Sequence, residues 1–363
     1  MRFPLAAAMV LAACRSPQPP PSSIVSIRHA VATDPVSEDP DDPAIWVHPT
    51  NPEHSLILGT NKAAAPRGAL VAYGLDGRRR QVVVGLNRPN NVDVEYGWKL
   101  GGAVVDIAVV TERFERCLRL YRIDRLTGAL AEVSGRLEVF AGEAGEAGAP
   151  MGIALFKRPR DGVIFAIVGR KTGPRNGYLW QYRIEDAGAG RARLVKVREF
   201  GRFSGGEEIE AIAVDDELGY VYYADEGDGI HKYHADPDHP DAVGELAHFG
   251  REGFLANREG IAIYARRGGA GYILCTDQID GNSRYRIYRR EGRQGNPHDH
   301  AEVLKVIAGG ADATDGLEAS SANLGARFPR GLLVAMNSGG KNFLVYRWED
   351  VAGSGERRLD SGR

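Results

Sequence analysis

Short runs of apolar and β-branched residues, separated by glycine-rich turns, recur along most of this chain. Each repeat opens with a short segment that starts on a mostly polar residue and continues as an alternating run, as in Asp42–Ile45 and Glu259–Ala262. Equivalent positions follow one another at intervals of 49, 60, 59, 49 and 56 residues, and they are Asp42, Asn91, Met151, Glu210, Glu259 and Asp315. Periods of about 40 to 60 residues that contain only short strands are typical of β-propeller blades.

Two further β-rich runs follow within each repeat. The second runs are Leu56–Thr60, Val105–Thr111, Ile164–Gly169, Tyr220–Ala224, Tyr272–Thr276 and Gly331–Met336. The third runs are Ala69–Tyr73, Leu118–Ile123, Tyr178–Ile184, Gly229–Tyr233, Arg284–Arg289 and Asn342–Trp348. Hairpin signals such as Leu75-Asp76-Gly77 separate them, and outer strands are expected at Val195–Phe200 and Glu302–Val306. The pattern predicts an all-β, six-bladed propeller with about four antiparallel strands per blade. We expect a strand near Ile24–His29 to close the ring by joining the last blade.

The two ends of the chain have a different composition from the repeats. Met1-Arg2 precedes a short apolar run that ends as Leu11-Ala12-Ala13-Cys14, which resembles a bacterial lipoprotein processing site. We expect a signal segment at 1–14 with a lipid on Cys14, a Pro/Ser-rich tether at 15–23, the propeller at 24–352 and a disordered tail at 353–363. These features predict secretion across the inner membrane and a periplasmic or outer-membrane, lipid-anchored location. An ordinary cleaved signal peptide with an incidental Cys14 is the alternative.

The charge balance and cysteine count exclude some classes of function. The 46 Lys and Arg residues nearly balance the 48 Asp and Glu residues, so no strong basic field exists for nucleic acid. Three cysteines exclude a disulfide scaffold and a Cys-rich zinc site. No apolar run approaches the roughly 20 residues needed to span a bilayer. We expect a monomer that meets a membrane only through Cys14.

Acidic residues are concentrated at the repeat positions that face the central channel. In a propeller the first strand of each blade lines the axis, so Asp42, Asn91, Met151, Glu210, Glu259 and Asp315 are expected to form a ring, with Asp93 on the same strand face as Asn91. Four carboxylates in one ring repel each other unless they are protonated or bridged by metal. An oxygen-rich ligand set without cysteine favours Ca²⁺, and we expect several ions.

A second ring is expected where the second strands end. Its members are Lys62, Arg113, Arg170 with Lys171, Glu226, Gln278 and Asn337. Cations come from the first three repeats, beside the carboxylates. Such a pairing suits a small polyanionic substrate, since metal ions and basic side chains can share its phosphate oxygens.

Ordered motifs across the chain carry a resemblance to a known family. The motifs are D-D-P-A-I-W at Asp41–Trp46, T-N-K at Thr60–Lys62, N-N-V-D-V at Asn90–Val94, V-D-I-A at Val105–Ala108, D-D-E-x-G at Asp215–Gly219, E-G-I-A-I-Y at Glu259–Tyr264, T-D-G at Thr314–Gly316, F-P-x-G-L at Phe328–Leu332 and N-F at Asn342–Phe343. In this order they resemble the β-propeller phytases, also called alkaline phytases or 3-phytases. The resemblance extends over nearly the whole predicted domain.

The resemblance implies a calcium-dependent phosphomonoesterase that acts on calcium–phytate by direct attack of water. It assigns calcium or water positioning to Asp42, Asp93, Glu210, Glu226, Glu259 and Asp315, with help from Asp41, and it places Asn257 at a calcium position. It assigns phosphate binding to Lys62, Arg113, Lys171 and the neighbouring Arg170, and places Gln278 on the substrate surface. Glu210, Asp315, Lys62 and Arg113 are then the catalytic residues, with Glu210 holding the attacking water.

The chain departs from the family pattern at three places. Met151 replaces a phosphate-contacting Tyr, Asn257 replaces a calcium-ligating Asp, and Ala63–Gly68 replaces a second basic residue. Two other functions stay open from the residues alone. A metal-dependent lactonase or esterase would share the axial metal, and a non-catalytic binding propeller at the cell envelope would need no acidic ring.

Overall fold

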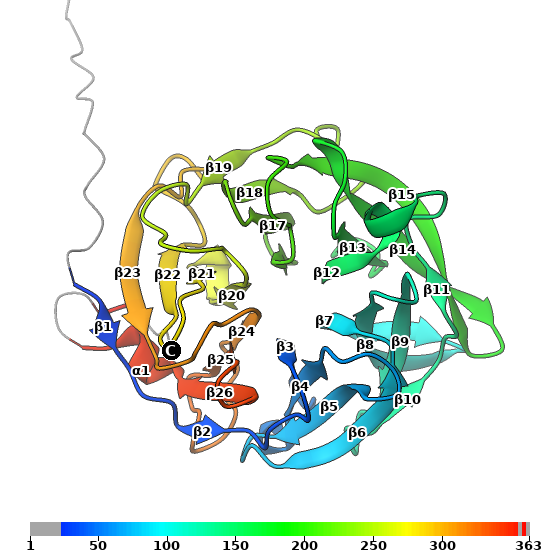
Figure 1. The fold of residues 1–363 in the computed structure, drawn as a ribbon, viewed down its shortest axis with the longest axis horizontal. Helices are drawn as coiled ribbons and strands as arrows, with labels where there is room; N and C mark the ends of the chain where they lie inside the picture. The colour runs from blue at the N-terminus through cyan, green and yellow to red at the C-terminus, as the bar shows by residue number, and fades with distance from the viewer. Residues whose placement is uncertain (1–22, 355–357, 361–363) are drawn as a thin grey trace, which may run out of the picture.

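The computed structural model describes residues 23–354 and 358–360, and it is a six-bladed β-propeller around a central channel (Figure 1). The predicted signal segment, Cys14 and residues 15–22 of the tether lie outside the described residues. No helix within the described ranges has the length and apolar character needed to cross a membrane.

Each blade is one sheet, and the chain builds the blades in sequence order. Blade one contains β3 (Pro40–Trp46), β4 (Leu56–Asn61), β5 (Gly68–Gly74) and β6 (Arg79–Leu86). Blade two contains β7 (Pro89–Leu100), β8 (Ala103–Glu112), β9 (Cys117–Ile123), β10 (Leu130–Glu132) and β11 (Leu137–Glu138). Blade three contains β12 (Pro150–Lys157), β13 (Ile164–Arg170), β14 (Asn176–Gly188) and β15 (Arg191–Arg202). Blade four contains β16 (Ile212–Asp215), β17 (Tyr220–Asp225), β18 (Gly229–His234) and β19 (Ala247–Phe249). Blade five contains β20 (Ile261–Ala265), β21 (Gly271–Asp277), β22 (Arg284–Arg289) and β23 (Val303–Ala308). Blade six contains β24 (Leu317–Ser320), β25 (Leu332–Asn337) and β26 (Asn342–Arg347). The described helices are the short η1 (Pro52–His54), η2 (Gly145–Gly148), η3 (Arg267–Gly269) and α1 (Trp348–Ala352). The predicted all-β class, blade number and strand order are confirmed.

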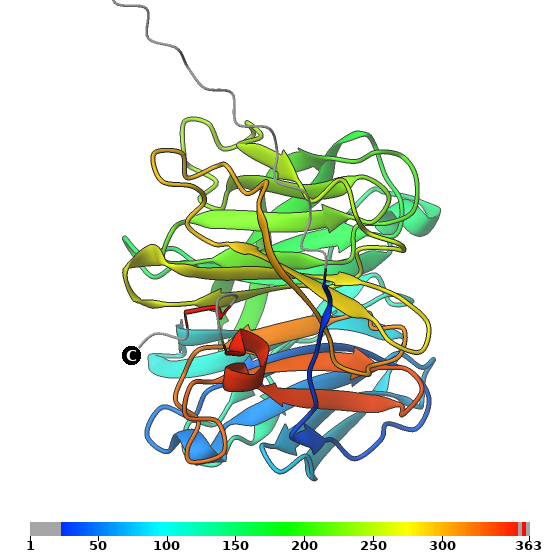
Figure 2. The same cartoon turned by 90° about the vertical axis from the view of Figure 1, so that its left-hand side faces the viewer.

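The N-terminal segment closes the ring differently from the prediction. β1 (Val25–Ser26) pairs in parallel with β23 of blade five, whereas β2 (Val31–Ala32) pairs with β26 of blade six. The expected strand near Ile24–His29 therefore joins the fifth blade, and the closing strand lies further along the chain (Figure 2). The apolar alternation of this segment suits the outer edge of any blade, so only the three-dimensional path of the chain selects between them.

The hydrophobic core is divided among the contacts between neighbouring blades. Each of the six buried clusters contains side chains from two adjacent blades, including the one that joins blade six to blade one through Phe343 and Ile57. Both faces of each blade are thus covered, which is why its strands are rich in apolar residues on both sides. The two described cysteines, Cys117 and Cys275, are buried and unpaired.

The predicted disordered tail differs from the structure at the residues described there. Leu359 is buried in the cluster between blades five and six, and its amide donates to Ala352 at 3.0 Å. The Asp360 carboxylate forms an ion pair with Arg266 at 2.8 Å. Leu359 is a single apolar residue in a polar stretch, so the sequence did not indicate that it would be buried.

Candidate functional site

Equivalent residues of all six blades meet at one end of the channel. Pro43, Val92 and Ile153 pair with the second strand of their blades two residues before that strand ends, and Ile212, Ile261 and Leu317 do the same in the other blades. Counting two residues back from these positions gives the equivalent residues at or just before the start of the inner strands, which are Asp41, Asn90, Met151, Glu210, Glu259 and Asp315. We call the end of the channel where they lie the mouth.

This register corrects two positions of the predicted ring. Asp41 and Asn90 occupy it, where the sequence analysis had placed Asp42 and Asn91. β3, β7 and β12 all carry a register shift near their start, and in β3 and β7 the repeat motif was aligned one residue too late. Such a bulge redirects successive side chains, and no sequence period reports it.

The last residue of each second strand is polar, and in several blades its side chain hydrogen-bonds a nearby loop. Asn61 Oδ1 accepts from the amide of Asp39 at 3.1 Å, and Asp277 Oδ1 accepts from the amide of Leu255 at 2.8 Å. Arg170 has the same position and is 1% exposed, donating to the carbonyl oxygens of Tyr178 and Gly177 at 2.9 Å each. Arg170 was expected to contact phosphate, but the structure buries it in blade three.

The residues one position later are Lys62, Arg113, Lys171, Glu226, Gln278 and Ser338. The predicted second ring has this position in five blades, while Asn337 lies one position too early. Asn337 instead accepts from the amide of Asp312 at 2.9 Å. The first three blades present cations and the fourth presents a carboxylate, as the sequence predicted.

Lys62 joins two carboxylates from opposite ends of the chain. Its Nζ lies 2.5 Å from Asp41 Oδ1 and 3.2 Å from Asp315 Oδ2. Burial opposes the charge on Lys62, but Asp41 and Asp315 outweigh it and raise the pKa of Lys62 above its ordinary value. Gln278 donates to the other oxygen of Asp315. Lys62 is therefore permanently charged and positioned between acids at the centre of the mouth.

Asn90 links this group to the carboxylates of blade four. Its Nδ2 donates to Asp41 Oδ2 at 3.1 Å and to Glu210 Oε1 at 2.9 Å. One oxygen of each of Glu208, Glu210 and Glu226 lies within 4.8 Å of the others, close enough for one metal ion. Asn90 was absent from the predicted site because it precedes the residue that the repeat alignment selected.

The carboxylates at the mouth are difficult to ionise in the protein alone. Burial raises the pKa of Asp41 and of Glu226 to about 8, and burial together with Asp41 raises the pKa of Glu210. Burial and the charges of Glu226 and Glu210 raise the pKa of Glu259 well above its ordinary value. Like charges held this close require protons or cations for compensation.

These residues fit calcium. The buried Oε2 of Glu208 and Oδ1 of Asn90 have no hydrogen-bond partner among the described residues. They are oxygen acceptors beside several carboxylates, which is the donor set that calcium prefers.

The cations of blades two and three border this group. Burial lowers the pKa of Arg113, and its buried Nε has no hydrogen-bond partner in the described part of the chain. Lys171 forms an ion pair with Glu208, and burial and the nearby Arg113 lower its pKa. A buried donor without an acceptor beside a second cation is suited to an incoming anion.

Asp42 and Asp93 lie deeper in the channel than the mouth residues. Together with Glu259 and Glu318 they line a cavity of about 100 Å³. Asp42 Oδ2 accepts from the amide of Val92 at 3.0 Å, and Asp93 Oδ2 accepts from the amide of Leu155 at 2.6 Å. Burial raises the pKa of Asp93 to about 7 and that of Glu318 to about 8. Glu318 belongs to this channel group, although the sequence analysis did not select it.

Glycine is required where the inner strands approach one another beside the mouth. A Cβ atom on Gly316 would lie 2.1 Å from Asp42 Oδ1, so any side chain there would displace the carboxylate. Gly152 and Gly260 occupy the equivalent position in two other blades.

The departures from the family pattern have clear positions in the structure. Asn257 donates through Nδ2 to Glu226 Oε2 at 3.0 Å, so it hydrogen-bonds a carboxylate where an aspartate would add another negative charge. Met151 occupies the blade-three position of the mouth ring and is 1% exposed. Its thioether offers phosphate no useful donor.

Comparisons with known proteins agree with this arrangement. A family model described as Phytase matches residues 6–361. A 3-phytase from Bacillus subtilis (strain 168) is 31% identical over 333 residues, covering 88% of this chain and 83% of that relative. Regucalcin, a calcium-binding protein from Agrobacterium tumefaciens strain C58, superposes with a TM-score of 0.51 and 12% identity, covering 86% of this chain and 87% of regucalcin. At that identity the superposition shows a shared fold alone.

Proposed function

This chain belongs to the phytase family, and on that premise we propose that it hydrolyses phytate, myo-inositol hexakisphosphate, in a calcium-dependent reaction. It is an enzyme that hydrolyses phosphate esters. The products are lower inositol phosphates and inorganic phosphate. The observation that carries the proposal is the meeting of Lys62, Arg113 and Lys171 with a cluster of carboxylates at one end of the channel. The lactonase and binding-module alternatives explain the metal or the fold, but neither explains these cations.

The basic residues bind and orient the phosphate to be cleaved. Arg113 has a buried Nε without a partner, and Lys171 lies beside it on the next blade. Lys62 is held at the centre by Asp41 and Asp315. These donors are preorganised, so they can stabilise charge that develops on the phosphate oxygens in the transition state without rearranging. Gln278 is suited to contact a neighbouring substrate oxygen from blade five.

The residues that would hold calcium at the mouth are Asp41, Glu208, Glu210, Glu226, Asn257, Glu259 and Asp315, and those that would hold it in the channel are Asp42, Asp93 and Glu318. When bound, calcium supplies positive charge that keeps these carboxylates ionised and neutralises the substrate phosphate. The binding of several ions also explains why so many acids with raised pKa values persist together.

Glu210 is placed to hold and deprotonate the attacking water. Asn90 donates to Glu210 Oε1 at 2.9 Å, which fixes the carboxylate and leaves Oε2 available to accept a proton. Glu210 is 7% exposed and lies between Asp41 and Glu226 at the centre of the cluster. Direct attack of water on phosphorus breaks the bond to the inositol oxygen, and that oxygen receives a proton as it leaves.

The direct test is phosphate release from phytate at about pH 7 with millimolar calcium and then with excess chelator. We expect release in calcium and a loss of at least about 10³-fold in chelator, because the phosphate would meet an uncompensated acidic cluster. Adding calcium back to the chelated sample should restore the rate, which controls for unfolding. Release that is unaffected by chelator contradicts calcium dependence, and hydrolysis of a lactone in place of phytate favours the esterase alternative.

The stability of the metal-free protein should decrease as the pH rises, because its buried carboxyl groups are most favourable when protonated. Burial raises the folded-state pKa of Asp41 and Glu226 to about 8 from 3.8 and 4.5. Since these values are raised, both groups contribute stability that is complete below about pH 4 and is lost as the pH rises through about 8. We expect the melting temperature of chelated protein to fall between about pH 5 and pH 8, and calcium to raise it by several degrees at pH 8. Equal melting temperatures with and without calcium across this range contradict the assignment.

We also propose that the protein is exported, acts as a monomer and carries a lipid on Cys14, which lies outside the described residues. Cells expressing the wild-type chain should retain it in the membrane fraction after lysis. Cys14→Ser should release it in soluble form or leave it unprocessed. Processed variant protein that stays in the membrane fraction contradicts the lipid anchor.

A further inference from the structure

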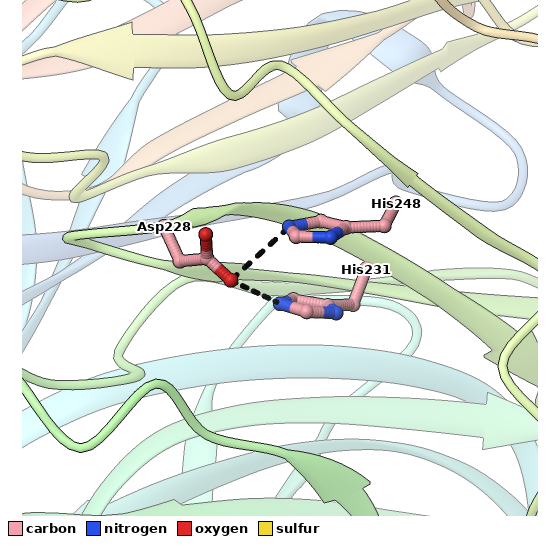
Figure 3. A group of neighbouring side chains, drawn as sticks. All are labelled: Asp228, His231 and His248. Atoms are coloured by element: carbon pink, nitrogen blue, oxygen red, sulfur yellow. Dashed lines mark ion pairs between the residues drawn. The ribbon is translucent and has the colours of Figure 1, made fainter.

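A second group of metal-ligating side chains lies in blade four, outside the mouth. Asp228 is in the turn between β17 and β18, His231 is on β18, and His248 is its register partner on β19, the outer strand of the blade. Figure 3 shows both imidazole rings directed toward the same oxygen of Asp228. Nothing in the proposed reaction uses these residues.

The ligand atoms converge, and two of them make no hydrogen bond with the described residues. One atom of each residue lies within 4.8 Å of the others. His248 Nε2 is 3.3 Å and His231 Nε2 is 4.0 Å from Asp228 Oδ2. The His231 side chain is 3% exposed, and the buried Nε2 atoms of both histidines make no hydrogen bond within the described part of the chain. Burying a ring nitrogen without a hydrogen bond is unfavourable, so a ligand is expected there.

Surrounding groups orient His231 for coordination. Its Nδ1 lies 2.9 Å from Glu245 Oε2, and the Tyr233 hydroxyl donates to the same oxygen at 3.2 Å. A carboxylate that accepts from Nδ1 places the proton there and leaves the lone pair on Nε2, directed at Asp228. This carboxylate–histidine pairing is the usual support of a metal-bound imidazole. Burial, followed by the charge of His231, lowers the pKa of His248, so His248 is a neutral potential ligand at pH 7.

The backbone leaves room for an ion beside these rings. A Cβ atom on Gly229 would lie 2.7 Å from His248 Nε2, so any other residue at this position would crowd the ligand atom. Arg251 lies 3.4 Å from Asp228 Oδ1, the oxygen that does not face the histidines. One carboxylate oxygen is thus held by an arginine while the other is directed at both rings.

We propose that Asp228, His231 and His248 bind a divalent transition-metal ion of the zinc class. Two imidazole nitrogens and one carboxylate oxygen favour zinc over calcium, and three protein ligands leave a fourth position for water or an external ligand. The rings are stacked with centroids 4.1 Å apart and planes at 12°, so they would tilt toward each other to share one ion. The ion would join β18 to β19 and fix the turn whose other end carries Glu226.

Zinc binding to calcium-saturated protein, measured by isothermal titration calorimetry, tests this proposal. Millimolar calcium occupies the oxygen sites, so the titration reports the nitrogen-containing site. We expect one zinc ion per chain, and at least about a tenfold loss of affinity in Asp228→Asn and in His248→Gln. Cobalt should give visible absorption bands typical of a low-coordinate site in the wild-type protein and not in these variants.

His239→Gln is the matched control. His239 stacks on His234 in the same blade with ring centroids 3.5 Å apart, but within the described part of the chain these two residues belong to no three-ligand group. Zinc affinity should be unchanged in this variant. If a ligand variant fails to fold, Gly229→Ala provides a second test, since its methyl group should weaken zinc binding at the same site. An equal affinity in wild type, Asp228→Asn and Gly229→Ala overturns the proposal, and so does an equal loss in His239→Gln.

Discussion

Glu210→Gln is expected to lower kcat for phosphate release from phytate by about 10²–10⁴-fold, the range for loss of a general base. Glutamine has nearly the same shape and its oxygen can still accept from Asn90, which donates to Glu210 Oε1 at 2.9 Å. It cannot accept a proton from water. Phosphate release in saturating calcium and phytate measures the effect, with circular dichroism to show that the variant is folded.

Glu138→Gln is the control for this substitution, because Glu138 is an exposed residue of β11 in blade two. Its kcat should equal that of the wild-type enzyme. Calcium affinity should also be measured in Glu210→Gln, since loss of one charge weakens metal binding. If saturating calcium restores the rate, Glu210 serves the metal only, and another group takes the proton.

Lys62→Met should lower kcat by about 10²–10³-fold, as expected when a preorganised donor to a developing oxyanion is lost. Lys62 Nζ lies 2.5 Å from Asp41 and 3.2 Å from Asp315. Its removal also leaves two buried carboxylates with less compensation. Burial raises the pKa of Asp315 to about 6 while Lys62 opposes this shift, so without Lys62 the pH–rate profile should move to higher pH.

The shift in pH profile separates a catalytic role from a purely structural one. Lys62→Arg retains the charge and should keep the wild-type pH profile with a smaller loss of rate, because the guanidinium fork differs in shape from an ammonium. Lys99→Met, at an exposed position of β7, is the neutral control. A rise in KM with unchanged kcat in Lys62→Met contradicts transition-state stabilisation by Lys62.

The position of the acidic site was predictable because carboxylates recur at one point of a regular repeat. Glu210, Glu259 and Asp315 hold the ring positions that the sequence predicted, and the inner strands that follow them pair without a register shift. The ring position of blade one was given to Asp42 in place of Asp41, because two acids are adjacent there and the sequence does not show which one faces the mouth.

Arg170 and Lys171 show the same limit in a second way. They are adjacent cations at the end of one strand, and sequence position alone gives both the same role. The structure buries Arg170 against two backbone carbonyl groups and leaves Lys171 at the mouth. Which of the two side chains reaches the mouth depends on which face of the strand each one lies on, and strand pairing determines that face.

The sequence by itself determined the fold class, the number of blades and the presence of an acidic ring beside a cationic sector, because each follows from residues that recur with the period of a blade. Tertiary structure decided the register within the ring, the blade that each N-terminal strand joins, and the zinc-type group of Asp228, His231 and His248. These features depend on contacts between residues that no repeat relates, and such contacts exist only once the strands have paired and the blades have closed into a ring.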